Sequence, residues 1–211
     1  MHIIAHRGYW MDSFQKNTGT AFRRALENGF GIETDFRDLN GELVVSHDIP
    51  TSGVMKAAEF IELYQSHPVS APIALNIKSD GLHNLIDDLR KRAEFKNSFV
   101  FDMSAPDMHA YLKNHTPTFT RLSEYEHRAI FLDSCIGVWL DAFESEWYNA
   151  KTIISLLNQN KQVAIVSSEL HGRNHSSLWG LIKDNQFHQH DLISICTDFP
   201  MQAKEYFYGQ D

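Results

Sequence analysis

The sequence has few of the features that mark secreted, membrane-spanning or disulfide-stabilised proteins. It contains two cysteines, Cys135 and Cys196, both in apolar runs, so buried free thiols are expected rather than a disulfide framework. No apolar run approaches the roughly 20 residues that a membrane-spanning helix needs, and the apolar run at the N-terminus is too short for a signal peptide. We therefore expect a soluble protein of the cytoplasm.

Positive charge is scarce as well. The chain carries 19 Lys and Arg residues against 27 Asp and Glu residues, which gives a formal net charge of −8. Binding to nucleic acid or to an acidic membrane surface needs a basic face, so this balance argues against both. An anionic substrate would need a local basic cluster instead, for which the candidates are Arg7, Arg37, Lys78 and Arg173.

Repeats, low-complexity tracts and linkers are also lacking, which with 43% hydrophobic residues over 211 positions predicts a single domain. Apolar runs typical of buried strands alternate with segments of helical apolar spacing. We expect strands at 3–6, 30–35, 72–78, 99–102, 118–121, 136–141, 162–167 and 192–197, and helices at about 21–26, 57–64, 82–95, 106–114, 147–159, 175–185 and 200–207. Such alternation predicts an α/β protein with a parallel sheet, and eight units in one domain predict a closed (β/α)8 barrel.

The stretch from His6 to Asp48 carries the clearest chemical signal. Glu33 and Asp35 lie two apart on the second strand, so their side chains point the same way. Two carboxylates with nothing basic between them repel each other unless a cation binds there, and Mg²⁺ or Ca²⁺ prefers such oxygen ligands. His6 and His47 end neighbouring strands, and histidine titrates near neutral pH. The four residues predict a divalent-metal site flanked by two acid–base histidines.

Two local features bear on this site. Asn17 precedes the first helix, where it either caps the helix or reaches the site, and both interpretations stay open. The run Leu-Asn-Gly-Glu at 39–42 is a tight-turn signal. It makes the segment from Asp35 to His47 a hairpin and brings these two residues within reach of each other.

The order and spacing of these residues closely resemble the glycerophosphodiester phosphodiesterases. The resemblance rests on His6, Arg7, Gly8, Asn17, Thr18, Ala21, Phe22, Ala25, Gly29, Glu33, Asp35, Gly41, Val44, Val45, His47 and Asp48, and later on 74–78 and 197–200. It implies a TIM barrel in which a cation is bound by Glu33 and Asp35. It also implies that His6 and His47 exchange protons with the nucleophile and the leaving group.

The substrate side of the site follows from the same resemblance and from the strand ends. Arg7 and Lys78 are expected to add positive charge at the phosphate. The full set of expected substrate-binding residues is Arg7, Lys78, Arg37, Asp102, Glu169 and Arg173.

The sequence departs from the family pattern at Asn76. The family places a glutamate, the third protein ligand of the metal, two residues before the strand lysine, which here is Lys78. An amide oxygen can bind Mg²⁺ or Ca²⁺ but brings no charge. We therefore expect Asn76 to be a weaker third ligand, with Asp102 on the next strand end as the nearest carboxylate that could compensate.

Two loops depart as well. The segment after Asp48 leads almost at once into a helix, where the family has a longer loop or a small subdomain, so a more open cleft is expected. After the seventh strand, Glu169, His171 and Arg173 stand where the family has a tryptophan-containing run. These three residues bind substrate or form a local salt bridge.

These features predict a metal-dependent phosphodiesterase that acts on a small-molecule or polymer-linked phosphodiester. One alternative is a non-catalytic protein that binds phosphodiesters on a lapsed enzyme scaffold, with Asn76 as the lesion. Another is a zinc amidohydrolase, which would want His-X-His on the first strand where His6-Arg7-Gly8 stands. The alcohol groups, the metal, the choice between water and a substrate hydroxyl as nucleophile, and the oligomeric state stay open.

Overall fold

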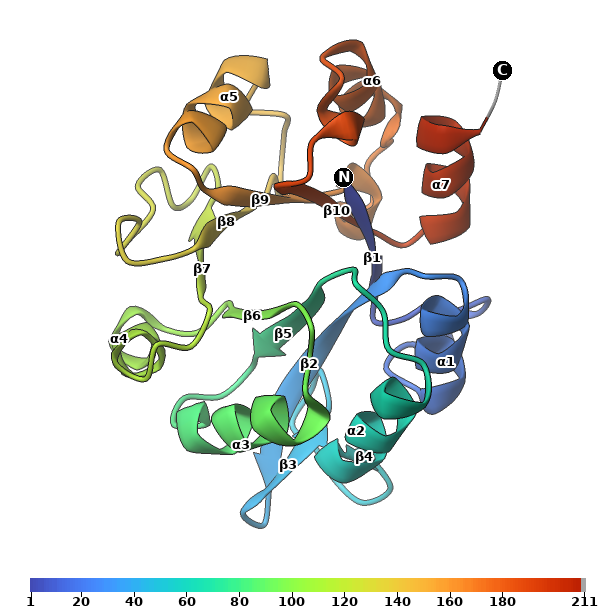
Figure 1. Ribbon diagram of the computed structural model, residues 1–211, viewed down its shortest axis with the longest axis vertical. Helices are drawn as coiled ribbons and strands as arrows, with labels where there is room; N and C mark the ends of the chain where they lie inside the picture. The colour runs from blue at the N-terminus through green and yellow to red at the C-terminus, as the bar shows by residue number, and fades with distance from the viewer. Residues whose placement is uncertain (210–211) are drawn as a thin grey trace.

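Residues 1–209 are described by a computed structural model, whose centre is a ring of eight parallel strands (Figure 1). The strands of the ring are β1 (His2–His6), β2 (Gly31–Leu39), β5 (Ile73–Ile77), β6 (Ser98–Phe101), β7 (Phe119–Leu122), β8 (Gly137–Leu140), β9 (Gln162–Val166) and β10 (Ile193–Thr197). From β1 the pairing runs through β2 and β5 to β6 in one direction, and through β10, β9 and β8 to β7 in the other. One bridge between Val100 and Thr118 joins β6 to β7 and closes the ring. The predicted TIM-barrel architecture is therefore confirmed.

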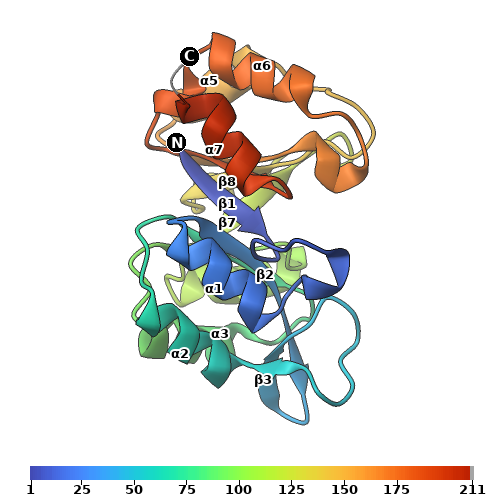
Figure 2. The ribbon, with the colours of Figure 1, turned by 90° about the vertical axis from the view of Figure 1, so that its right-hand side faces the viewer.

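Seven α-helices surround the ring, and Figure 2 shows the first three on one side of the strands and the last three on the opposite side. They are α1 (Gly19–Glu27), α2 (Ala57–Ser66), α3 (His83–Ala93), α4 (Ala105–Lys113), α5 (Ala150–Asn158), α6 (Ser176–Asp184) and α7 (Pro200–Tyr208), with short 3₁₀ helices η1 (Ser13–Gln15), η2 (Ser168–His171) and η3 (Phe187–Gln189). All seven match predicted helices. Within residues 1–209, no helix combines the length and the apolarity needed to cross a membrane.

The fifth unit of the barrel differs from the regular alternation, because β7 runs to β8 through turns and bends rather than a helix. Residues 123–129 are mostly polar or charged, and the apolar residues Ile130, Phe131 and Leu132 follow as a block rather than at helical spacing. No apolar stripe is therefore available to pack a helix against the strands here.

The predicted hairpin follows β2. Strand β3 (Glu42–Val45) pairs antiparallel with the end of β2, with Phe36 opposite Val45, and β4 (Met55–Lys56) pairs with β3. Asn40 and Gly41 form the turn with φ of +53° and +83°, the left-handed pair that a tight hairpin turn requires. The hairpin carries the chain from the barrel wall to His47.

Buried apolar side chains form two groups, one between strands and helices and one inside the ring. The inner group is Ile4, Ala74, Phe99, Phe101, Phe119, Trp139, Ala164, Val166 and Cys196. Its aromatic rings gather on β6, β7 and β8, where Phe99 stacks on Phe119 with centroids 3.6 Å apart and Phe101 stacks on Trp139 at 3.9 Å. Cys196 and Cys135 are buried free thiols, as predicted.

Candidate functional site

A cavity of about 300 Å³ opens where the strands of the ring end. Its polar lining is His6, Arg7, Glu33, His47, Asn76, Lys78, Asp102, Arg121, Asp141 and His171, and its apolar lining is Phe101, Trp139, Phe143, Val166 and Leu170. The predicted site residues outside this lining are Asp35, Arg37, Glu169 and Arg173.

The turn after β1 depends on Gly8. Its φ is +88°, and a Cβ at this position would lie 2.8 Å from the backbone carbonyl carbon of Ala21. The start of α1 packs directly on the turn, since the Tyr9 amide donates to the Ala21 carbonyl at 3.0 Å. Only glycine meets both requirements, and the turn holds Arg7 at the cavity.

Three polar residues around the cavity have left-handed backbone conformations. They are Arg7 with φ +57°, Asn17 with φ +59° and Asp102 with φ +74°. Such conformations are unfavourable for non-glycine residues and gather at functional sites, where the surrounding structure holds them. These three residues therefore depend on the surrounding structure for their conformation, and six other non-glycine residues with positive φ lie elsewhere in residues 1–209.

Glu33 is the buried acid at the centre of this region, with 2% of its side chain exposed. Its Oε1 accepts from Asn76 Nδ2 at 3.0 Å, its Oε2 accepts from the Arg7 amide at 3.3 Å, and His6 Nε2 lies 3.9 Å from Oε2. Burial, reinforced by the neighbouring Asp35 carboxylate, raises the pKa of Glu33. A cation bound beside Glu33 would relieve this cost.

Asp35 is also fully buried, but unlike Glu33 its negative charge has two cationic side chains beside it. Arg7 Nε lies 3.1 Å from its Oδ2, and Lys78 Nζ lies 3.6 Å from its Oδ1. This corrects the expectation that nothing basic lies between the two carboxylates, because the sequence did not indicate that Arg7 and Lys78 both turn toward Asp35.

Asn17 also contacts Asp35. Its Nδ2 donates to Asp35 Oδ2 at 2.8 Å, and its Oδ1 accepts from Thr34 Oγ1 at 2.9 Å. The cap of α1 is the next residue, Thr18, whose hydroxyl accepts from the amide of Ala21. Of the two interpretations left open for Asn17, contact with the site is the one observed.

Glu33, Asp35 and Asn76 carry oxygen atoms of the kind that binds a hard divalent cation. Asp35 and Asn76 face each other in the pairing of β2 with β5, and the Oδ1 atom of each is buried without a hydrogen-bond partner among the described residues. Carboxylate and amide oxygens are the ligands that Mg²⁺ and Ca²⁺ prefer. Residues 1–209 hold no group of three or more His, Cys, Asp or Glu arranged for a metal.

His6 is held by Asp198, a residue to which the sequence gave no individual role. Nδ1 of His6 lies 2.6 Å from Asp198 Oδ1. An ionised carboxylate can only accept, so Nδ1 carries the proton and Nε2 presents a lone pair on the side of Glu33. Asp198 is itself held, because its amide donates to Glu169 Oε1 at 3.1 Å. The only sequence signal for it was the family-like ending at 197–200.

His47 is less constrained than His6. It lies in the loop after β3 with 44% of its side chain exposed, against 14% for His6. Its Nδ1 lies 2.9 Å from the carboxylate of Asp48, which is itself 94% exposed. His47 therefore borders the cavity from a solvent-facing loop.

Asp102 does not join the oxygen atoms around Glu33. Its carboxylate accepts from Lys78 Nζ at 3.0 Å and from Arg121, which also pairs with Glu126. Two cations contact Asp102, as they do Asp35, but Asp102 has no hydrogen bond or ion pair with Glu33 or Asn76 among the described residues, which favours Asn76 over Asp102 as the third ligand.

Three further predicted residues hold loops rather than face the cavity. Glu169 accepts from the Thr197 hydroxyl and the Asp198 amide, Arg173 donates to the Ala142 carbonyl, and Arg37 Nε donates to the His47 carbonyl at 3.0 Å. Direct substrate binding by these three is not supported by their contacts. In sequence, His171 lies between Glu169 and Arg173, and its side chain does line the cavity. Its Nε2 atom is 2.7 Å from Asp141 Oδ1.

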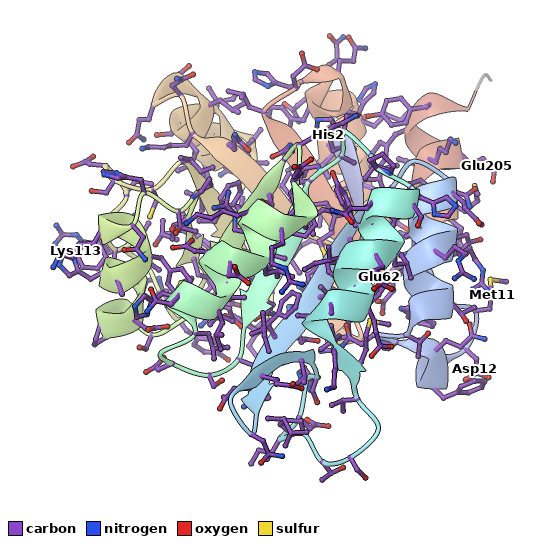
Figure 3. All side chains as sticks on the ribbon, turned by 60° about the horizontal axis from the view of Figure 1, so that its bottom comes forward. His2, Met11, Asp12, Glu62, Lys113 and Glu205 are labelled. Atoms are coloured by element: carbon purple, nitrogen blue, oxygen red, sulfur yellow. The ribbon has the colours of Figure 1, made fainter. Side chains whose placement is uncertain are left out.

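A groove of about 690 Å³ adjoins the cavity and shares Arg7 and His47 with it. The rest of its lining is Lys16, Asn17, Thr18, Gly19, Val45, Ser46, Asp48, Gly53, Val54, Met55 and Glu59. The loops that form its walls carry Met11, Phe14 and Ile49, which are 68%, 76% and 83% exposed, and Figure 3 shows Met11 at the edge of the molecule beside α1. The groove agrees with the open cleft expected from the short segment after Asp48.

Comparison with solved structures identifies proteins of the same fold. A Galdieria sulphuraria protein, provisionally described as a glycerophosphodiester phosphodiesterase, is 15% identical, with a TM-score of 0.73 over 98% of this chain and 97% of that one. An Oleispira antarctica phosphodiesterase, solved with the product sn-glycerol 3-phosphate, is 15% identical, with a TM-score of 0.68 over 98% and 96% of the two chains. A Ca²⁺-dependent phosphatidylinositol-specific phospholipase C from Streptomyces antibioticus is 12% identical, with a TM-score of 0.57 over 96% and 95%. No protein-family model and no curated protein matches the sequence.

Proposed function

We propose that this chain, which has the fold of the glycerophosphodiester phosphodiesterases, is a metal-dependent phosphodiesterase. It cleaves a glycerophosphodiester or a related phosphodiester to a phosphomonoester and an alcohol. The observation that carries the proposal is the buried carboxylate of Glu33, whose close partners are neutral donors and His6, a histidine fixed by Asp198. A buried acid with a raised pKa beside an oriented base in a cavity is typical of a reaction centre.

Positive charge for the phosphate comes from Arg7 and Lys78. Both line the cavity while facing Asp35, so their charges are held in place before the substrate binds. Fixed charges of this kind stabilise the negative charge that develops on phosphate oxygens during the reaction. A divalent cation bound by Glu33, Asp35 and Asn76 would add to this neutralisation.

Proton transfer is assigned to the two histidines. The lone pair of His6 Nε2 accepts the proton of the attacking group, and Asp198 stabilises the resulting imidazolium. His47, which lines both the cavity and the groove, supplies a proton to the leaving alkoxide. The attacking group is a water molecule or a neighbouring hydroxyl of the substrate. In the second case a cyclic phosphodiester forms as the alcohol leaves, and water then opens it to the phosphomonoester with the two histidines exchanging their acid and base roles.

The solved neighbours support the substrate class and the cofactor. The Oleispira antarctica phosphodiesterase holds sn-glycerol 3-phosphate and the Streptomyces antibioticus enzyme requires Ca²⁺, which agree with a glycerol-type phosphodiester and with the oxygen ligands around Glu33. The groove beside the cavity leaves room for a larger group on one side of the phosphate, including a polymer-linked one.

The test is turnover of a panel of phosphodiesters by metal-stripped protein to which Mg²⁺, Ca²⁺ or Mn²⁺ is returned. We expect hydrolysis that depends on the added cation and that is lost in His6→Ala. Hydrolysis that persists at full rate in a chelator would refute the metal dependence. A zinc amidohydrolase is not favoured, because Gly8 stands where the second histidine of a His-X-His pair would be.

The replacement at Asn76 favours one other function, a phosphodiester-binding protein on the same scaffold. It predicts that phosphodiesters bind without being cleaved under any of these conditions. Calorimetric binding measured alongside turnover separates the two functions.

A further inference from the structure

A second histidine–aspartate pair lines the cavity, and the proposed reaction does not use it. Asp141 directly follows β8 and is 5% exposed, while His171 ends η2 after β9. The two side chains meet at 2.7 Å. Neither contacts Glu33, Asp35 or Asn76 through any hydrogen bond of the described residues.

The pair is held in one geometry by its surroundings. Asp141 Oδ1 accepts from the Ala142 amide at 2.8 Å, and Trp147 Nε1 donates to the Asp141 carbonyl at 2.8 Å. Arg173 donates to the Ala142 carbonyl and so ties the loop after β9 to the loop after β8. Side chains fixed in this way are ready to bind a group without rearrangement.

The tautomer of His171 follows from its partner. An ionised aspartate only accepts hydrogen bonds, so Nε2 of His171 carries the proton and Nδ1 keeps a lone pair. No hydrogen bond among residues 1–209 involves that Nδ1 atom. It is therefore available as an acceptor for an O–H group of a ligand.

The side chains near His171 suit a hydroxylated carbon chain. The ring of Phe143 lies 4.7 Å from that of His171, and the Arg121 guanidinium lies 5.6 Å from the centre of the Phe143 ring. An apolar ring between hydrogen-bonding groups can cover carbon atoms while the polar groups bind hydroxyls. Among the described residues, the cation at this end of the cavity, Arg121, already pairs with Asp102 and Glu126, so it is not free to bind a second anionic group.

We propose that His171, positioned by Asp141, recognises a free hydroxyl on the alcohol substituent of the substrate, which makes that substituent a polyol rather than an alkyl or aryl group. The inference rests on the proposed function, which puts the phosphate at Arg7 and Lys78 and leaves this end of the cavity for the substituent. His171 is a specificity-determining residue, and proton transfer stays with His6 and His47.

The test compares two ligands that differ in hydroxyl groups alone, glycerol 3-phosphate and propyl phosphate. Calorimetry measures the affinity of each for wild type, for His171→Ala and for His109→Ala, an exposed histidine on α4 that serves as the matched control. We expect wild type and the control to bind glycerol 3-phosphate about tenfold more tightly, the scale of one hydrogen bond in a fixed site. In His171→Ala the ratio of the affinities for glycerol 3-phosphate and propyl phosphate should fall to near one, and propyl phosphate should bind as tightly as it does to wild type.

A second variant keeps the test decisive if His171→Ala does not fold. In His171→Phe a ring of similar size stays in place, but the Nδ1 acceptor is removed. The preference should then fall although the shape of the cavity is largely kept. An unchanged preference in the folded variants, equal weakening of both ligands, or no preference in wild type would overturn the proposal.

Turnover separates this inference from the function on which it rests. If wild type hydrolyses no phosphodiester but shows a preference that depends on His171, the phosphodiesterase proposal fails and the recognition of hydroxyls stands. If it hydrolyses phosphodiesters without such a preference, only the role of His171 fails.

Discussion

The two halves of the cavity balance their charges in different ways. In the half built on β1, β2 and β5, Glu33 is buried with a raised pKa, and Asp35 Oδ1 and Asn76 Oδ1 have no hydrogen-bond partner among the described residues. In the half built on β6 to β9, Asp102 pairs with two cations and Asp141 pairs with His171. In the first half the side chains of Arg7 and Lys78 face Asp35 and neither pairs with Glu33 among the described residues, whereas both carboxylates of the second half are paired. This difference agrees with the proposal that the first half binds the phosphate and the second half binds the hydroxyl groups of the substituent.

The largest loss of activity should come from replacing either of the two histidines to which proton transfer is assigned. We predict that His6→Ala lowers kcat about a hundredfold or more with the fold intact, because a general base is lost, and that His47→Ala does so on a similar scale. His171→Ala should leave kcat on a simple aryl phosphodiester almost unchanged. Rates on that substrate, with circular dichroism of each variant, test this. Full activity in His6→Ala or His47→Ala would remove that residue from the mechanism.

The next largest effect should be on metal affinity, because Asn76 brings no negative charge to the predicted metal site. With Glu33 and Asp35 as the anionic ligands, metal and phosphodiester should assist each other's binding, with a coupling on the order of 1–3 kcal/mol. Asn76→Glu should tighten metal binding in the absence of substrate and weaken that coupling. Calorimetric titrations with and without a non-hydrolysable phosphodiester measure both quantities.

The control for this prediction lies in the other half of the cavity. Asp102→Asn should leave the metal affinity nearly unchanged, because Asp102 already pairs with Lys78 and Arg121. The opposite result would be equal metal affinity in wild type and Asn76→Glu together with weaker metal binding in Asp102→Asn. It would mean that Asp102, and not Asn76, is the third ligand.

A smaller effect should appear in the stability of the metal-free protein. The raised pKa of Glu33 means that the folded state binds its proton more tightly than the unfolded state. The stability from protonated Glu33 is therefore fully present below the ordinary pKa of 4.5 and is lost as pH rises through the higher pKa of the folded state. The stability of Glu33→Gln should not fall in this way as the pH rises, because glutamine does not titrate.

Thermal unfolding measured across pH in the presence of a chelator tests the prediction. In a chain of this size, each kcal/mol of lost stability should lower Tm by about 2–4 °C. Added Mg²⁺ or Ca²⁺ should restore the stability of wild type at neutral pH and leave Glu33→Gln nearly unaffected. Parallel curves for the two proteins would show that Glu33 titrates alike in the folded and unfolded states.

The smallest effect should come from the groove. Because it adjoins the cavity at Arg7 and His47, wild type should accept a bulky group on one side of the phosphate. Ile49→Ser and Phe14→Ser should raise KM for bulky apolar phosphodiesters by about fivefold, the scale of 1 kcal/mol from a partly buried apolar side chain. Ile154→Ser, which removes an exposed side chain of α5 away from the groove, is the control. Strict preference for the smallest substrate would contradict the role of the groove.

The sequence predicted the barrel and the first half of the cavity well, because both depend on local patterns. Apolar runs located every strand of the ring, and Glu33 and Asp35 share a face because of their spacing on one strand. Contacts that join distant parts of the chain could not be read in this way. Asp198 meets His6 across 192 residues, and neither residue's neighbours in sequence indicate the other.

The second half was harder to predict because it is built from loops. Glu169, His171 and Arg173 are close in sequence, yet only His171 lines the cavity, and the short turn of η2 decides which one does. The direction of Arg7 and Lys78 toward Asp35 likewise depends on left-handed backbone and on strand register, neither of which leaves a mark in composition.

The aromatic floor of the cavity limits how this protein can evolve. Phe101 and Trp139 belong to the packed interior of the ring and also line the cavity, so changing either to admit a new substrate would leave a void in the barrel. His171 and Ile49 stand on loops and can be replaced without disturbing that packing. New substrate ranges should therefore arise by drift in the loops after β3 and β9, while the floor stays constant among descendants of this chain.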